Sequence, residues 1–224
     1  MKNYWWKILA VICLFYSLVA GLLFNVPELN ILEESIRNLF FHVPMWFSMM
    51  FLMFLSLFYS IKYLSTQNPL DDIKAANYAK VGFVFGLLGI ITGSIWAKAT
   101  WGKFWVFQEV KLNGAAAAIL VYVAYFILRN SFSDEQMKAR LSAVYNIFSF
   151  VMFMVLINVI PRITDSSLHP GNGGNPGFNA YDLDNNLRLV FYPAVIGWIL
   201  LSYWIAQILI RLDKLERKIL NLEL

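Results

Sequence analysis

The sequence is poor in the residues on which most catalytic and metal sites depend. Its 224 residues include one cysteine, Cys13, and two histidines, His42 and His169. A single cysteine excludes an intrachain disulfide, a metal site built from several thiolates and the CxxCH motif. Two histidines cannot supply the four protein ligands of an ordinary structural zinc site. P-loop, HExxH and GxSxG motifs are also absent, so we expect no ATP hydrolysis and no enzymatic activity from this chain.

Charged residues are scarce as well. They make up 14% of the chain, while 59% is hydrophobic and the mean hydropathy is +0.60. Soluble proteins carry about 25% charged residues, so the composition indicates a protein that crosses a membrane several times. The net charge is +4, but the basic residues cluster between apolar runs, which is typical of topology signals. We therefore expect a lipid bilayer, and no nucleic acid, as the surroundings of this chain.

Six apolar runs are long enough to cross a bilayer, at about 1.5 Å per residue against an apolar core of about 30 Å. They lie near residues 5–24, 43–64, 79–96, 115–128, 141–160 and 189–210. The predicted fold class is an all-α integral membrane protein with six transmembrane helices, forming a single polytopic domain over residues 1–224. The first run could also be a signal peptide, but its length favours a retained anchor.

Lysine and arginine are distributed unevenly between the two sides of these spans. One side has six: Arg37, Lys98, Lys103, Lys111, Arg162 and Arg188. The other side has the remaining twelve of the eighteen, and the side richer in positive charge should be cytoplasmic. Both termini are then cytoplasmic, the connections 25–42, 97–114 and 161–188 are short outer-surface loops, and residues 211–224 form a cytoplasmic helix.

The first outer connection should contain a short amphipathic helix. Asn30 and Glu33 fit an N-cap and its N3 partner, and apolar residues follow at helical spacing. We expect His42 and the two residues after it to end this helix, with Pro44 in the first turn of the second span. The third outer connection is rich in Gly, Pro and Asn and predicts an irregular loop that carries His169.

Aromatic residues are concentrated in the second outer connection. The stretch TGSIWAKATWGKFWVFQEVK, residues 92–111, contains Trp96, Trp101, Phe104, Trp105 and Phe107. One interpretation is an interfacial aromatic belt, which anchors many membrane proteins. Another is a flat binding surface, because the stretch is too polar to span the membrane and too aromatic for an ordinary tether.

Both histidines are predicted to lie on this same outer side. Each alone could be a helix-end cap or a surface residue. Together with aromatic walls and cations they match haem, whose iron takes axial histidines, whose macrocycle takes apolar and aromatic contacts, and whose propionates take basic partners. The cations available on the outer side are Lys98, Lys103, Lys111, Arg162 and Arg188.

Each histidine lies in a short motif, FFHVP before the second span and SSLHPG after the fifth, and the tryptophan-rich stretch lies between them. In these three motifs the sequence resembles the CcmC family of haem-handling proteins of cytochrome c biogenesis. The family pattern in the tryptophan-rich stretch is roughly WGxWWxWD with a basic residue soon after. Trp101, Gly102 and Trp105 match it, phenylalanines replace two tryptophans, and Lys111 corresponds loosely to the basic end. Gln108 stands where the family has aspartate, and we expect the adjacent Glu109 to point elsewhere.

The resemblance implies a function and a set of site residues. His42 and His169 would be axial ligands of a non-covalent, b-type haem. Its binding surface would comprise Trp96, Trp101, Gly102, Phe104, Trp105 and Phe107. The protein would present haem at the periplasmic face of the cytoplasmic membrane, pass it to the haem chaperone CcmE, and work beside an ABC-type complex of CcmA, CcmB and CcmD.

Two other classes of function remain open from the residues alone. A b-type electron-transfer subunit would have its ligand histidines within helices, whereas the two here are predicted at helix ends. A small-molecule permease would more often show broken spans or charges near the midplane, and the predicted spans contain few.

Overall fold

The computed structural model describes residues 4–27, 32–164, 167–169, 183 and 185–220, and no strand occurs among them. Six helical stretches are long and apolar enough to cross a membrane, which confirms the predicted fold class. The main helices are α1 (Trp5–Leu23), α2 (Leu39–Thr66), α3 (Pro69–Trp101), α4 (Val110–Asn130), α5 (Glu135–Met154) and α7 (Asn185–Ile219). A 3-10 helix, Glu33–Asn38, precedes α2, and α5 continues through a π-helical segment, Val155–Val159, into the short α6 (Ile160–Ile163).

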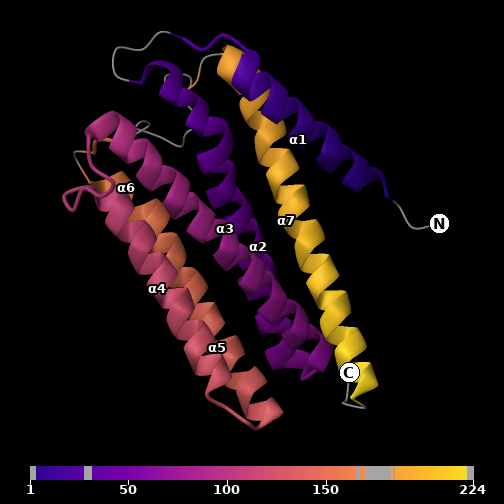
Figure 1. The fold of residues 1–224 in the computed structure, drawn as a ribbon. Helices are drawn as coiled ribbons and strands as arrows, with labels where there is room; N and C mark the ends of the chain where they lie inside the picture. The colour runs from indigo at the N-terminus through magenta and orange to yellow at the C-terminus, as the bar shows by residue number, and fades with distance from the viewer. Residues whose placement is uncertain (1–3, 28–31, 165–166, 170–182, 184, 221–224) are drawn as a thin grey trace.

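The hairpin of α2 and α3 is the centre of the bundle (Figure 1). The pair α4 and α5 packs against one side of it, and α7 packs against the other. Helix α1 covers the outer face of α7, where Gly197 lets the backbone of α1 approach at Leu14. The four helices α2 to α5 therefore enclose a common interior, and α1 lies outside it.

Several helices extend beyond the apolar runs that predicted them. Helix α3 begins at Pro69, where the Asn68 side chain accepts a hydrogen bond from the Leu70 N–H at 2.9 Å, and it ends at Trp101 before Gly102, whose φ is 76°. The loop between α3 and α4 is accordingly shorter than the predicted connection 97–114. Hydropathy reports only the part of a helix that lies in lipid, so polar end turns are missed.

The start of α2 also differs from the prediction. No separate surface helix ends at His42; the 3-10 helix runs directly into α2, and Pro44 lies inside α2. Asn30, the predicted N-cap, lies outside the described residues. A proline removes only its own N–H from the helical ladder, and near a helix start this loss is tolerated. His42 is consequently held by a helix.

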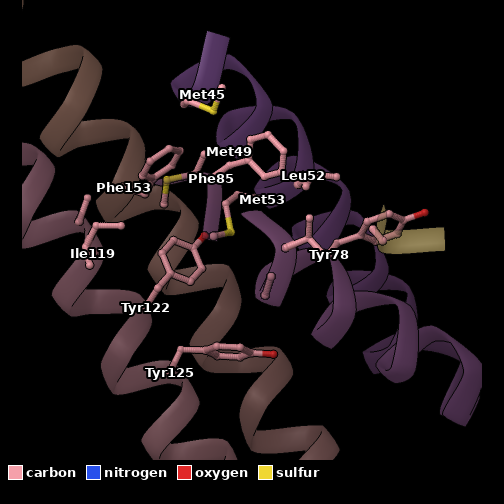
Figure 2. Packing of buried hydrophobic residues seen from close by; sticks show 14 of the residues in the cluster. Met45, Met49, Leu52, Met53, Tyr78, Phe85, Ile119, Tyr122, Tyr125 and Phe153 are labelled. Atoms are coloured by element: carbon pink, nitrogen blue, oxygen red, sulfur yellow. The ribbon is translucent and has the colours of Figure 1, made fainter. Parts of the chain in front are cut away.

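The interior is filled by large side chains from all four central helices (Figure 2). Met49 and Met53 of α2 lie against Phe85 of α3, with Tyr122 of α4 and Phe153 of α5 beside them. All five are at most 4% exposed. Methionine is unbranched and fills irregular gaps between aromatic rings. These side chains therefore fill the middle of the bundle.

Close packing of α2 on α3 depends on glycines that face α2. A Cβ on Gly89 would lie 2.8 Å from the Trp46 ring, and one on Gly93 would lie 2.6 Å from Cε1 of His42. Real Cβ atoms do not approach other atoms so closely. The same face of α3 continues along the helix as Gly82, Gly86, Gly89 and Gly93. Glycine therefore makes room for Trp46 and His42 between the helices.

The opposite end of the bundle is held by polar contacts. Arg129 of α4 donates to both carboxylate oxygens of Asp72 on α3, at 2.7 and 2.6 Å. The predicted cytoplasmic helix 211–224 continues α7 as far as Ile219, and its Asp213 accepts a hydrogen bond from Asn77 at 2.6 Å. Residues 221–224 lie outside the described part of the chain.

Candidate functional site: a tryptophan-walled pocket

A pocket opens at the end of the bundle where α2 begins, α3 ends and α4 begins. The π-helical segment and α6 close its remaining side. Its aromatic walls come from Trp46, Trp96, Trp101 and Trp105, and its polar lining includes His42, Lys111, Asn158, Arg162 and His169. The structure thus brings together residues from three predicted outer connections that are far apart in sequence.

His42 is fixed by hydrogen bonds to α3. Its Nδ1 lies 2.9 Å from the Gly89 carbonyl oxygen and 3.2 Å from Oγ1 of Thr92. A carbonyl can only accept, so Nδ1 carries the hydrogen and donates it. The other nitrogen, Nε2, then has a free lone pair. Histidines that bind metals are typically oriented in this way, because the ring nitrogen that does not bind the metal donates its hydrogen to a backbone carbonyl.

His169 faces His42 across the pocket. The two ring centroids are 6.3 Å apart and the ring planes are inclined by 39°. Metal–imidazole bonds are about 2 Å long, so two imidazoles on one metal have centroids roughly 6 Å apart. The observed spacing fits a bis-histidine metal. Two imidazoles are a donor set that fits haem iron, because haem brings its own equatorial ligands and takes only axial ligands from the protein.

Tryptophans surround His169. The rings of Trp96 and Trp101 lie 5.9 and 6.3 Å from its ring, and they contact each other edge to face. Trp105 also lines the pocket, and its Nε1 donates to Oδ1 of Asn113 on α4. Three of the predicted aromatic residues are therefore placed where a flat apolar ligand would meet them.

Three other predicted residues lie away from the pocket lining. Phe104 and Phe107 are 59% and 78% exposed, and Gly102 follows the end of α3 in the left-handed conformation. The backbone of L residues rarely adopts this conformation, so the conformational freedom of Gly102 serves the turn. A role of these residues in binding haem stays a prediction.

Two of the five candidate cations line the pocket, Lys111 and Arg162. Lys98 donates to the Gly102 carbonyl at 2.9 Å and lies over the Phe104 ring. Lys103 is exposed on the loop after α3, and Arg188 is half-buried on α7. Lys111 and Arg162 are thus the cations placed to meet an anionic group of a ligand in the pocket.

The contacts of Glu109 were not predicted from the sequence. It is 2% exposed and precedes the first residue of α4, whereas Gln108 is exposed. Its Oε1 accepts hydrogen bonds from Oγ of Ser167 at 2.6 Å and from the Lys111 N–H at 3.3 Å, and its Oε2 accepts from the Leu168 N–H at 2.8 Å. Glu109 thus points in a different direction from Gln108, as expected, and it does not line the pocket. An acidic residue just before a helix start turns toward free N–H groups, and this signal was available in the sequence.

Two further residues that line the pocket, Trp46 and Asn158, were not predicted from the sequence. Trp46 lies one helical turn after His42, and Asn158 belongs to the π-helical segment, where its amide nitrogen lies 3.8 and 3.6 Å from the sulfur atoms of Met50 and Met154. Nothing in the hydropathy of residues 141–160 signals a π-helix, although such segments are frequent at functional sites.

Comparison with known proteins finds a family model and several relatives that carry the same description. The family model described as "Heme exporter protein C" (CcmC) matches residues 2–222. Three relatives carry the name Heme exporter protein C and are each 26% identical to this chain, over 122 residues in Bradyrhizobium diazoefficiens, 183 in Escherichia coli K12 and 162 in Paracoccus denitrificans.

These alignments include 54%, 75% and 72% of this chain and 46%, 66% and 66% of the respective relatives. The chain thus matches about half to two thirds of the length of these relatives. The family model, by contrast, covers almost the whole chain. The chain belongs to the heme exporter protein C family, CcmC.

Proposed function

We propose that this chain binds haem non-covalently in the tryptophan-walled pocket, with His42 and His169 as its two axial ligands. The observation that carries the proposal is the pairing of the two imidazoles across an aromatic pocket, with Nδ1 of His42 already donated to a carbonyl. The proposal includes a place for the site, at the periplasmic face of the cytoplasmic membrane, because the pocket lies at the end of the bundle that has fewer cations.

Each group in the pocket has a distinct task in this proposal. His42 offers Nε2 from a helix, and His169 offers the opposing ring from the connection after α6. Trp96 and Trp101 give aromatic contact beside His169. Lys111 and Arg162 pair with the propionates, since charged donors make the stronger hydrogen bonds to carboxylates. Haem itself supplies the iron and the equatorial ligands.

We further propose that the bound haem is cargo, passed to a haem chaperone of the CcmE type. A cargo site must hold one part of its ligand and leave another accessible. Here one ligand lies on a helix and the other on a connection, and the pocket lies at the end of the bundle. A b-type electron-transfer subunit would instead hold both histidines on helices. The chain acts as a binding protein rather than an enzyme, and energy for release comes from a partner complex of CcmA, CcmB and CcmD.

The test is an absorption and electron paramagnetic resonance study of the purified chain. The parent should show a Soret band and a low-spin, bis-imidazole signal. His42→Ala and His169→Ala should each lower haem content and remove the low-spin signal, while the exposed Gln108→Ala variant should match the parent. A parent without haem, or unchanged spectra in both histidine variants, would refute the proposed site. Haem loss from the parent only when the chaperone is added would support transfer.

A further inference from the structure

The geometry points to Glu109 as a positioning residue that holds His169 opposite His42. This inference rests on the proposed function of the pocket, but it concerns how the chain itself is arranged. Glu109 does not line the pocket. It acts through the segment Ser167 to His169, and it joins that segment to the start of α4.

The contacts form a continuous path from the glutamate to the histidine. The Ser167 hydroxyl donates to Oε1 of Glu109 at 2.6 Å, and the Leu168 N–H donates to Oε2 at 2.8 Å. The Ser167 oxygen in turn accepts a hydrogen bond from the His169 N–H at 3.1 Å. Both carboxylate oxygens are thus committed to the two residues that precede His169, and the path ends on the backbone of His169.

The surroundings of Glu109 use both of its carboxylate oxygens as hydrogen-bond acceptors. Glu109 is 2% exposed and its Oε1 also accepts from the N–H of Lys111 in the first turn of α4. The N-terminus of a helix stabilises negative charge, and hydrogen bonds to ionised acceptors are roughly twice as strong as neutral ones. An amide in place of the carboxylate would keep one acceptor oxygen and lose the charge.

The position of Glu109 in the chain links His169 to the tryptophans of the pocket. Glu109 belongs to the loop between α3 and α4, which also carries Trp105, and α3 ends at Trp101, whose ring contacts His169. One junction therefore fixes both the tryptophan wall and the second histidine. His42 needs no such tether because α2 carries it.

Glu109→Ala should weaken haem binding about 10- to 100-fold, the range found when a residue that orients a metal ligand is removed. The haem that remains should lose the low-spin signal, because His42 stays in place while His169 is released. Added imidazole should restore that signal in Glu109→Ala, as it should in His169→Ala. Glu109→Gln should lie between Glu109→Ala and the parent, and Gln108→Ala serves as the matched neighbour.

A second measurement needs no haem. Hydrogen–deuterium exchange of the haem-free chain in nanodiscs reports on the Leu168 and His169 amides directly. Exchange of a peptide covering residues 167–169 should be faster in Glu109→Ala and intermediate in Ser167→Ala, which keeps the Leu168 contact. Gln108→Ala should exchange like the parent.

The outcomes separate this inference from the proposed function. If the parent binds no haem, the proposed function fails, while exchange still decides whether Glu109 holds the segment. If the parent binds low-spin haem but Glu109→Ala keeps both the parent spectrum and the parent exchange, the positioning role is wrong. Should Glu109→Ala fail to insert, Glu109→Gln and Ser167→Ala give the same decision, since unchanged exchange in both would overturn the tether.

Discussion

Gly93 of α3 lies directly against the imidazole of His42, and a Cβ at this position would lie 2.6 Å from Cε1 and 3.1 Å from Nδ1 of that ring. Gly93→Ala should therefore displace the ring and disturb its hydrogen bond to Gly89. Because loss of such a bond typically lowers metal affinity about 10- to 100-fold, haem retained by the purified variant should fall by a factor in that range. Titration of the haem-free protein with haem measures the change.

Gly82→Ala is the matched control for this variant. It lies on the same face of α3, but its nearest neighbours are Met53 and Leu52, at 3.1 and 3.3 Å. Methionine adapts its shape at little cost, and neither neighbour lines the pocket. Haem affinity should stay at the parent value. Equal losses in both variants would show that the packing of α2 on α3, rather than His42, is what Gly93 serves.

The aromatic stretch of residues 92–111 gives a second prediction, because some of its rings line the pocket and others are exposed. Trp101→Ala removes a ring beside His169 and should lower haem affinity by at least about fivefold, from roughly 1 kcal/mol of lost aromatic contact. Trp101→Phe should be milder. Phe107→Ala removes a ring that is 78% exposed and should leave haem affinity unchanged. If the tryptophan and phenylalanine variants behave alike, the interfacial-belt interpretation accounts for both.

The number of helices could be predicted from the sequence because lipid imposes a simple length rule on apolar runs. Helix ends could not. The first turns of α3 contain Asp71, Asp72 and Lys74, which hydropathy assigns to a connection, yet all three belong to the helix. Asp71 pairs with Lys74 one turn along α3 and with Lys62 of α2, whereas Asp72 pairs with Arg129 of α4. The pair with Arg129 forms only after α3 and α4 have packed, and a window of sequence does not contain that partner.

Residues of the candidate site could be predicted where their type is rare in this chain or clustered in its sequence. His42 and His169 stood out because the chain has two histidines, and Trp96, Trp101 and Trp105 because three tryptophans fall within ten residues. Trp46 lies in an ordinary apolar span, so no local signal marks it. The outward positions of Phe104 and Phe107 depend on the turn at Gly102, and a motif in sequence does not say which of its rings face inward.

The buried pair of Asp72 and Arg129 gives a third prediction, about stability. The side chains are 8% and 11% exposed, so removal of one partner leaves a buried charge uncompensated. Arg129→Met should lower the free energy of unfolding by about 3 to 5 kcal/mol, as measured by denaturation in detergent. Lys138→Met, at the more exposed pair with Glu135, should cost no more than about 1 kcal/mol.

The haem spectrum should be the same in both variants, since Arg129 lies near the end of α4, whereas α4 lines the pocket with residues near its start. A double variant, Asp72→Leu with Arg129→Met, should recover much of the lost stability because no unpaired charge remains. If Arg129→Met lowers the free energy of unfolding no more than Lys138→Met does, the ion pair of Asp72 and Arg129 does not stabilise the packing of α3 on α4.

The orientation of the bundle gives the last prediction. Twelve of the eighteen Lys and Arg residues fall on the side that carries the turn between α4 and α5, and six on the pocket side, so positive charge predicts a periplasmic pocket. In a background where Cys13, the single cysteine, is replaced by Ser, a cysteine can be placed at Ser133 in that turn or at Lys103 beside the pocket, both exposed. A membrane-impermeant maleimide added to intact cells should label Lys103→Cys at once and Ser133→Cys only after permeabilisation. Labelling in the reverse order would place both histidines on the cytoplasmic side, and handoff of haem to a periplasmic chaperone from this pocket would then be ruled out.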